Sequence, residues 1–155
     1  MPSVTIRPGV PADLDAVREV FRGASLSNAG DREVLLRHPE VLVWDGEPLV
    51  AGRTRVAVTH EGLVVGFATT TERDGEWELD DLFVDPDRRR LGIATRLVSG
   101  LVGCVHVTAN PHAAAFYASV GFVPDGQAPT RFGPAPRMRL DVPPVGVTDV
   151  EQHGE

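Results

Sequence analysis

A strand that runs into an arginine-rich turn and then into a helix constrains this chain more than any other segment. Residues 76–84 read as the strand, Asp85-Pro86 ends it, and Gly92 opens an amphipathic helix. Such a turn presents free backbone N–H groups at the positive end of a helix dipole, which favours a bound phosphate. Gly92 would let the backbone approach the anion, and Arg89 or Arg90 would add charge-assisted contacts. A glycine here can also serve a tight turn alone.

The remaining pattern mixes helices with antiparallel and parallel strands. Acid–glycine pairs at 61–62 and 74–75 are hairpin signals, and together with alternating apolar residues they predict three consecutive strands. Strands are expected at 4–7, 54–59, 63–71, 76–84, 105–109, from 122, near 130–132 and at 138–142, and helices from Pro11, at 31–38, 91–102 and 111–120. Residues 124–136 read as loops around a short strand, and Gly103 as a helix cap. We therefore expect an α+β fold with a partly antiparallel sheet and helices on both faces.

The length suits one domain, which we expect over residues 1–142, followed by a disordered tail at 143–155. No basic and apolar leader and no long apolar run is visible, so the sequence predicts neither a signal peptide nor a membrane span. The single cysteine, Cys104, excludes an internal disulfide and any multi-cysteine metal site, and it favours the reducing cytoplasm.

Two further absences narrow the chemistry. The chain contains no lysine, which excludes a Schiff base and a lysine-bearing phosphate loop. The five histidines are scattered without metal-ligand spacing, so no metal is expected. The net charge of −7 also argues against a nucleic-acid partner.

That charge is concentrated in one segment. Residues 72–87 hold eight acids and one arginine, and Arg88, Arg89 and Arg90 follow at once. This order of acids and then arginines has two explanations. It can be a solvated acidic strand edge beside a basic turn, or a site that binds a cationic group at one end and a polyanion at the other.

Two blocks carry a family resemblance. Arg89-x-x-Gly92-x-Ala94 resembles the Gln/Arg-x-x-Gly-x-Gly/Ala signature of the GNAT superfamily of acyl-CoA-dependent N-acetyltransferases, and residues 79–84 resemble the family's fourth strand. Downstream, Asn110-x-x-Ala113-x-x-Phe116-Tyr117-x-x-x-Gly121-Phe122 resembles its second conserved block, in the family's order and separation. The resemblance covers roughly residues 4–142. Arg90 stands where many members have glycine, and Ala94 replaces the last glycine.

The resemblance implies a GNAT fold, with a mostly antiparallel twisted sheet of six to seven strands flanked by about four helices. It also implies a cofactor site for acetyl-CoA. The pantetheine arm would pair with the backbone of Leu82, Phe83 and Val84, and the pyrophosphate would lie at the turn. The implied cofactor-binding residues in and after the turn are Arg89, Arg90, Leu91, Gly92, Ile93, Ala94 and Thr95, with Asn110, Ala113 and Phe116 beyond them.

The resemblance also implies the catalytic groups. Tyr117, the one tyrosine, falls where family members often carry the acid that protonates the coenzyme A thiolate, and with both motifs present we favour that role over simple core packing. The N–H of Val84 would polarise the thioester carbonyl. Asp80 resembles the position of an acid that helps to deprotonate the amine, and Glu78 or ordered water can take that part. Strand alternation puts Asp81 on the opposite face.

The expected activity is direct transfer of an acetyl group from acetyl-CoA to a primary amine of a small molecule, in a ternary complex. Acetylation of a protein or peptide, and a non-catalytic acyl-CoA sensor, are the alternatives. A homodimer is compatible with the family. The acceptor would be chosen by residues 21–39 and 124–136, which carry no readable motif.

Overall fold

The computed structural model describes residues 4–27, 29–88, 91–109, 113–130 and 133–143. It contains a seven-stranded sheet in the order β1-β2-β3-β4-β5-β7-β6. The chain divides into two compact units, and strands β3 and β4 each contribute to both. Unit 1 comprises Met1–Thr70 and Asp81–Val98, and unit 2 comprises Thr71–Asp80 and Ser99–Glu155.

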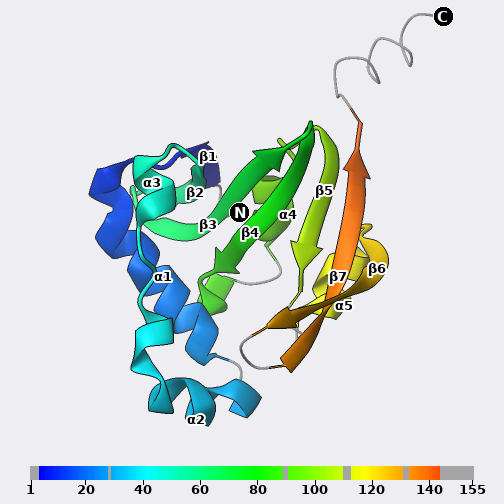
Figure 1. The fold of residues 1–155 in the computed structure, drawn as a ribbon. Helices are drawn as coiled ribbons and strands as arrows, with labels where there is room; N and C mark the ends of the chain where they lie inside the picture. Colours follow the sequence, from blue (N-terminus) through cyan, green and yellow to red (C-terminus); the bar gives the residue numbers. More distant parts are fainter. Residues whose placement is uncertain (1–3, 28, 89–90, 110–112, 131–132, 144–155) are drawn as a thin grey trace, which may run out of the picture. The chain divides into compact units, whose positions relative to one another are not determined.

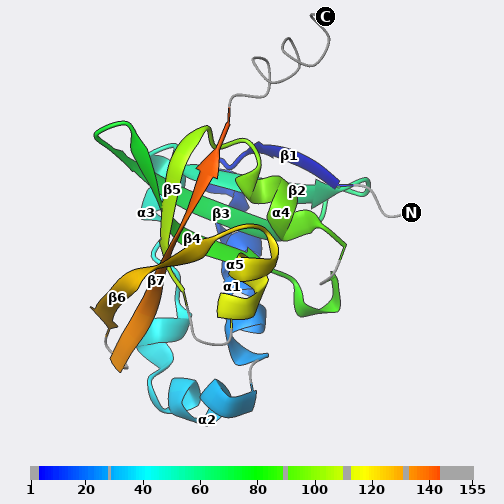
Figure 2. The same cartoon turned by 90° about the vertical axis from the view of Figure 1, so that its right-hand side faces the viewer.

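Unit 1 combines an antiparallel ladder with helices on both faces. Its strands β1, β2 and β3 pair antiparallel in sequence order, and helices α1 and α4 lie on opposite faces of them (Figures 1 and 2). Its elements are β1 (Val4–Pro8), η1 (Pro11–Asp13), α1 (Leu14–Leu26), α2 (Ala29–Arg37), η2 (Pro39–Leu42), α3 (Glu47–Val50), β2 (Thr54–Thr59), most of β3 (Val64–Arg73), the end of β4 (Glu76–Val84), η3 (Pro86–Arg88) and α4 (Ile93–Val98).

The core of unit 1 forms where α1 packs on the strands. Val17 and Val20 of α1 are buried with Val56 of β2 and Phe67 of β3. These positions recur at helical spacing on α1, which is why this amphipathic segment folds against the sheet. On the other face, the Arg55 side chain of β2 donates a 2.7 Å hydrogen bond to the carbonyl of Leu97, which ties α4 to the same strands.

An ion pair holds the beginning of unit 1. The guanidinium of Arg7 donates hydrogen bonds of 2.9 and 3.0 Å to the two carboxylate oxygens of Asp13. The backbone N–H of Val10 donates a third, of 2.9 Å, to the same carboxylate. The Asp13 side chain therefore caps the start of the helical segment, as the acid of a capping box does, and its bonds to Arg7 connect this segment to β1.

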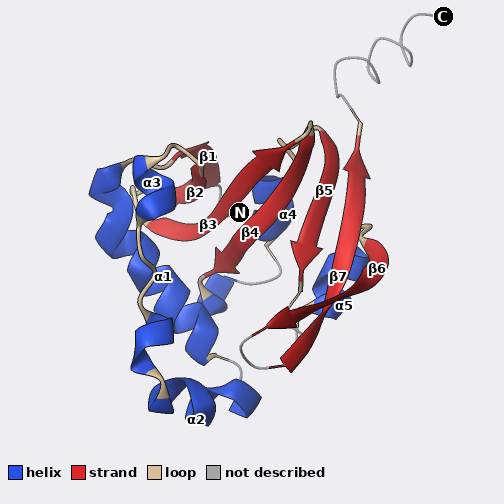
Figure 3. Ribbon diagram, viewed as in Figure 1, coloured by secondary structure: helices blue, strands red, loops and turns tan. Residues whose placement is uncertain are grey.

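Unit 2 is a second sheet region with one apolar and one polar face. Its elements are the start of β4, β5 (Gly103–Thr108), α5 (Ala114–Ser119), β6 (Val123–Thr130) and β7 (Gly133–Val142). Strand β4 pairs parallel with β5, and β5–β7 and β7–β6 pair antiparallel (Figure 3). Val105 and Val107 are buried, and a Cβ built at Gly121 would lie 3.1 Å from Leu140, so the turn after α5 packs tightly on the sheet.

The structure confirms the mixed fold class and the seven strands, with five α-helices where about four were expected. Strands 54–59 and 76–84 have the predicted bounds. The loops predicted for 124–136 are wrong, because most of that segment belongs to strands β6 and β7. Strand β6 lies at an edge of the sheet, where proline is tolerated.

Other element bounds also differ. The helix predicted at 91–102 is confined to α4, and Gly103 does not cap it but opens β5 with a φ of +112°. The short helix α3 was not predicted. Apart from Pro143, the predicted tail lies outside the described residues. Every helix in the described part of the chain is too short or too polar to cross a bilayer.

Candidate active site

The end of β4 offers backbone groups that point away from its neighbour β3. The N–H of Asp85 donates a 2.8 Å hydrogen bond to the carbonyl of Val65 on β3. In an antiparallel pair, alternate residues face the same neighbour, so the N–H and C=O of Leu82 and Val84 point to the other side. The parallel pairing of β4 with β5 covers Trp77–Leu79, before this stretch. Leu82 and Val84 can therefore bind an extended ligand in the manner of an added strand.

The side chain of Phe83 fixes this stretch in unit 1. Its ring stacks on Phe67 with centroids 5.6 Å apart and meets the edge of Phe21 at 4.9 Å. Both partners belong to the interface between α1 and the sheet. Because the middle residue is anchored in this way, the backbone orientation of its two neighbours is set by core packing.

The turn after β4 is compact, and the space around its glycine, Gly92, is free of other described atoms. The carboxylate of Asp85 accepts a 3.0 Å hydrogen bond from the N–H of Asp87, inside the η3 turn. Gly92 adopts a φ of +79°, and a Cβ built there would meet no other described atom within 4 Å. Its carbonyl accepts a hydrogen bond from the N–H of Arg96, so it begins the hydrogen bonding of α4. The backbone at Gly92 can thus be approached closely by an anion.

The other predicted residues of the turn differ in exposure. Leu91 and Thr95 are exposed, Ala94 is half-buried and Ile93 is buried beneath them. Arg89 and Arg90, which the sequence assigned to phosphate binding, lie outside the described residues.

Adjacent acids of β4 have different partners. In unit 1, Asp81 accepts hydrogen bonds from the indole N–H of Trp44 at 3.0 Å and the hydroxyl of Thr69 at 2.6 Å. In unit 2, the exposed Asp80 accepts a 2.7 Å hydrogen bond from the hydroxyl of Thr71. The two threonines are two residues apart, whereas their partners are consecutive. Asp81 and Asp80 are thus bonded to different threonines of β3.

Glu78 is held by a cation. Its carboxylate accepts a 2.6 Å hydrogen bond from Arg137 of β7, which also donates to the hydroxyl of Thr108. The hydrogen bond to Glu78 raises the pKa of Arg137 above its ordinary value, against the opposing effect of burial. Both side chains are half-buried.

Tyr117 lies on α5 in unit 2 and is only 6% exposed. Its ring meets Phe116 and Phe122 edge to face, at 5.3 and 5.1 Å. Ala113 and Phe116 are half-buried, and Asn110 lies outside the described residues. The aromatic cluster fixes the ring, so a hydroxyl at its end is held in one position.

The structure also brings together a group that sequence analysis missed. Glu76 of β4 and Cys104 and His106 of β5 place their donor atoms within 4.8 Å of one another. The sequence analysis considered the spacing of the histidines alone and therefore did not reveal this cluster. The available signal was Cys104-x-His106 at the start of the strand predicted from residue 105, because residues two apart on a strand share a face.

Comparison with known proteins places this arrangement in context. Residues 51–124 match the family model described as an acetyltransferase (GNAT) domain. No curated protein matches the chain. Among solved structures, the PaiA N-acetyltransferase of Thermoplasma acidophilum in complex with coenzyme A has a TM-score of 0.70 at 18% identity, covering 90% of this chain and 99% of that one.

Two further solved structures are similar. The ribosomal-protein-S18-alanine N-acetyltransferase of Escherichia coli has a TM-score of 0.65 at 22% identity, covering 92% of this chain and 96% of its own. YncA of Salmonella typhimurium, solved with its cofactor acetyl-CoA, has a TM-score of 0.61 at 22% identity, covering 92% and 95%. At these identities the likeness establishes the fold.

Proposed function

Because the chain carries a GNAT acetyltransferase domain, we propose that it transfers the acetyl group of acetyl-CoA directly to a primary amine of a small molecule, in a ternary complex. The observation that carries this proposal is the end of β4. There, the backbone of Leu82 and Val84 is directed away from β3, and the turn to Gly92 follows. An extended chain ending in a pyrophosphate matches both features, and coenzyme A is such a molecule.

The donor would be held mainly by backbone. Leu82 and Val84 would pair with the amide groups of the pantetheine arm, and the N–H groups after residue 90 would bind the pyrophosphate. The open space at Gly92 supports this assignment. The roles of Arg89, Arg90 and Asn110 remain proposals from the family resemblance.

The acetyl transfer requires a base, a polarised carbonyl and an acid. We assign the polarising group to the N–H of Val84 and the acid to Tyr117, since a phenol is protonated at neutral pH and this ring is held rigidly. We assign the base to Asp80, as the family resemblance implies, and keep Glu78, which is paired with Arg137, as the alternative. The base takes a proton from the ammonium, and the amine attacks the thioester carbon. The carbon–sulfur bond then breaks, Tyr117 protonates the departing thiolate, and the second proton lost by the new amide nitrogen restores the phenol.

A cationic amine is the proposed acceptor class. The support is the exposed carboxylate of Asp80 within a segment of eight acids, which lowers the free energy of a nearby ammonium. The proposed location is the cytoplasm, which the single cysteine supports. We also propose a homodimer, which sedimentation of the purified protein tests.

Binding of the donor is tested by thermal unfolding. Acetyl-CoA at 100 times its dissociation constant should stabilise the chain by about 2.7 kcal/mol, which for this size raises the melting temperature by about 5–10 °C. The absence of any shift up to millimolar acetyl-CoA would contradict both the enzyme and the sensor.

Turnover is tested by thiol release from acetyl-CoA over a panel of polyamines, amino acids, aminoglycosides and peptides. Release with small amines supports the proposal, and release with peptides alone replaces it by the protein-directed alternative. Binding without release from any member of the panel would favour a sensor.

A further inference from the structure

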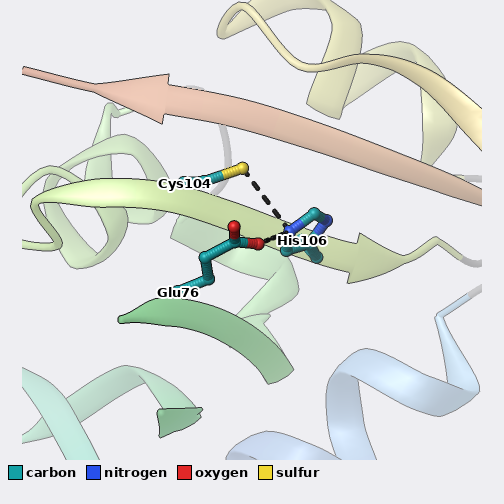
Figure 4. Close-up of side chains that lie close together, drawn as sticks. All are labelled: Glu76, Cys104 and His106. Atoms are coloured by element: carbon teal, nitrogen blue, oxygen red, sulfur yellow. Dashed lines mark hydrogen bonds and ion pairs between the residues drawn. The ribbon is translucent and has the colours of Figure 1, made fainter. Parts of the chain in front are cut away.

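Three potential metal ligands meet on the polar face of unit 2. Glu76 begins β4, and Cys104 and His106 lie on β5, with their side chains converging (Figure 4). The Nε2 atom of His106 lies 2.6 Å from the Glu76 carboxylate and 3.4 Å from the Cys104 sulfur. One imidazole nitrogen is therefore next to both other donors.

The backbone explains why these three side chains share a face. Cys104 and His106 are two apart on one strand, and their side chains point the same way. The parallel register pairs Glu78 with His106 and Trp77 with Val105, so Glu76 emerges on the same face beside Cys104. The cluster thus follows from regular strand pairing.

The separations suit a small tetrahedral cation. Zinc–ligand distances imply separations of about 3.6 Å between a nitrogen and a sulfur ligand and about 3.4 Å between a nitrogen and an oxygen ligand. The nitrogen–sulfur pair is close to this value as it stands. Glu76 would have to retreat by under an ångström, which is open to a side chain that is 54% exposed.

A carboxylate lies near the second nitrogen of the imidazole. The Nδ1 atom of His106 is buried and has no hydrogen-bond partner among the described residues. The carboxylate of Asp125 lies 3.7 Å from it. A carboxylate behind a metal-ligating imidazole fixes its tautomer and raises its basicity. Here a small shift of Asp125 would supply that bond.

The local charge favours a cation. Asp141 stands opposite Cys104 in the β5–β7 register. Arg139 stands opposite His106 in the same register. Three carboxylates, counting Asp125, thus surround the thiol and imidazole, with Arg139 as the opposing charge.

We propose that Glu76, Cys104 and His106 form a binding site for one zinc ion, with water as the fourth ligand. A thiolate, an imidazole and a carboxylate are the three donor types that zinc accepts. Binding displaces the thiol proton to solvent, so that Cys104 binds as thiolate and the ion replaces the hydrogen bonds that now join the three side chains. The site does not depend on the proposed acetyl transfer.

Cobalt substitution tests the site directly, using purified full-length protein without an affinity tag. A thiolate bound to Co²⁺ gives a charge-transfer band in the near ultraviolet, and Cys104 is the only cysteine, so the band reports on this residue alone. We expect the band to saturate at one equivalent and to be removed by added Zn²⁺. Competition with a chromophoric chelator then gives the zinc affinity.

Four variants distinguish zinc binding by all three side chains from metal binding by the Cys104 thiol alone. Cys104→Ser should abolish the band, and Glu76→Gln and His106→Gln should each weaken zinc binding about tenfold or more. Glu61→Gln, on the turn between β2 and β3, is the matched control and should leave the affinity unchanged. Glu76→Gln alters an exposed side chain, so it keeps the test valid if His106→Gln fails to fold.

Two results would overturn the proposal. One is the absence of a Co²⁺ band in the wild-type protein at millimolar metal. The other is a band that Glu76→Gln leaves unchanged in both intensity and affinity, because that would mean binding by the thiol alone.

Discussion

Arg137 donates a 2.6 Å hydrogen bond to the carboxylate of Glu78, reaching from β7 across β5 to β4. Glu78 and Asp80 are the two candidate bases that the sequence offers, and their contacts differ. The ion pair with Arg137 gives Glu78 a structural contact within unit 2. Asp80 is exposed and accepts a 2.7 Å hydrogen bond from the hydroxyl of Thr71.

Asp80→Asn and Glu78→Gln should therefore have different effects. We expect Asp80→Asn to lower kcat about a hundredfold and to flatten the alkaline-rising limb of kcat/KM against pH. Glu78→Gln should instead cost about 1–3 kcal/mol of stability, because it leaves the Arg137 charge without its partner. Parallel pH–rate profiles and thermal melts check both. A rising limb lost in Glu78→Gln and kept in Asp80→Asn would reverse the assignment.

Tyr117→Phe removes the hydroxyl and keeps the ring that packs against Phe116 and Phe122. If Tyr117 is the acid, kcat should fall about a hundredfold. The rise in melting temperature caused by acetyl-CoA should stay the same, because the aromatic cluster is intact. Unchanged turnover on the best acceptor would leave Tyr117 with a packing role only.

Gly92→Ala tests the phosphate turn against a matched control. Gly92 and Gly52 have φ values of +79° and +75°, and a Cβ at either would meet no described atom within 4 Å. Both substitutions should thus cost about 1–2 kcal/mol from backbone strain alone. Only Gly92→Ala should also weaken acetyl-CoA binding, measured by titration calorimetry. Equal acetyl-CoA affinities of the two variants would remove Gly92 from the donor site.

Gly66→Ala tests the packing of α4 on β3. A Cβ at Gly66 would lie 3.2 Å from the carbonyl oxygen of Phe83 and 3.3 Å from Ile93 and Leu97. The carbonyl belongs to backbone and cannot move aside, so we expect a loss of about 1–3 kcal/mol. Gly23→Ala, in α1 with its nearest contact at 4.0 Å, should instead stabilise the chain by about 0.5–1 kcal/mol. Urea unfolding of both variants measures this contrast, and a neutral Gly66→Ala would contradict it.

Asp13 predicts a specific dependence of stability on pH. The hydrogen bonds from Arg7 lower the pKa of Asp13 below its ordinary value, and the N–H of Val10 adds to this while burial opposes it. A carboxyl whose pKa is lower in the folded state stabilises the fold above its unfolded pKa, near 4, and loses that effect as the pH falls through the folded value.

Asp13→Asn should therefore be destabilised by about 1–2 kcal/mol at pH 7, with the difference from wild type shrinking below about pH 4. Melting temperatures between pH 3 and 8 measure it. Asp15→Asn, which alters an exposed acid of the same segment, should show no such convergence. A constant difference for Asp13→Asn across this range would contradict the role of the ion pair.

The sequence predicted the elements whose patterns are local. Strand 76–84 has flanking turn signals and a clear alternation, and it was predicted with its observed bounds. The phosphate turn was recognisable because Gly92 and the residues around it are contiguous. The prolines of β6 and β7 were misread as loop signals, since nothing local reveals that β6 lies at an edge of the sheet.

Contacts between distant strands could not be predicted in the same way. The partner of Glu78 is 59 residues away, and the cluster of Glu76 with Cys104 and His106 depends on the register of a parallel pair. Such pairings between strands decide which donor atoms meet.

The prolines of β6 have a consequence for association between chains. Strand β6 ends the sheet, and Pro124 and Pro129 have no N–H to donate along it. The register also shifts between Pro124 and Gln127, so a strand from another molecule would find an irregular ladder there. Edges of this kind resist continuation of a sheet from one molecule into the next. Aggregation by strand addition is therefore disfavoured at this end, and a homodimer would have to use a different surface.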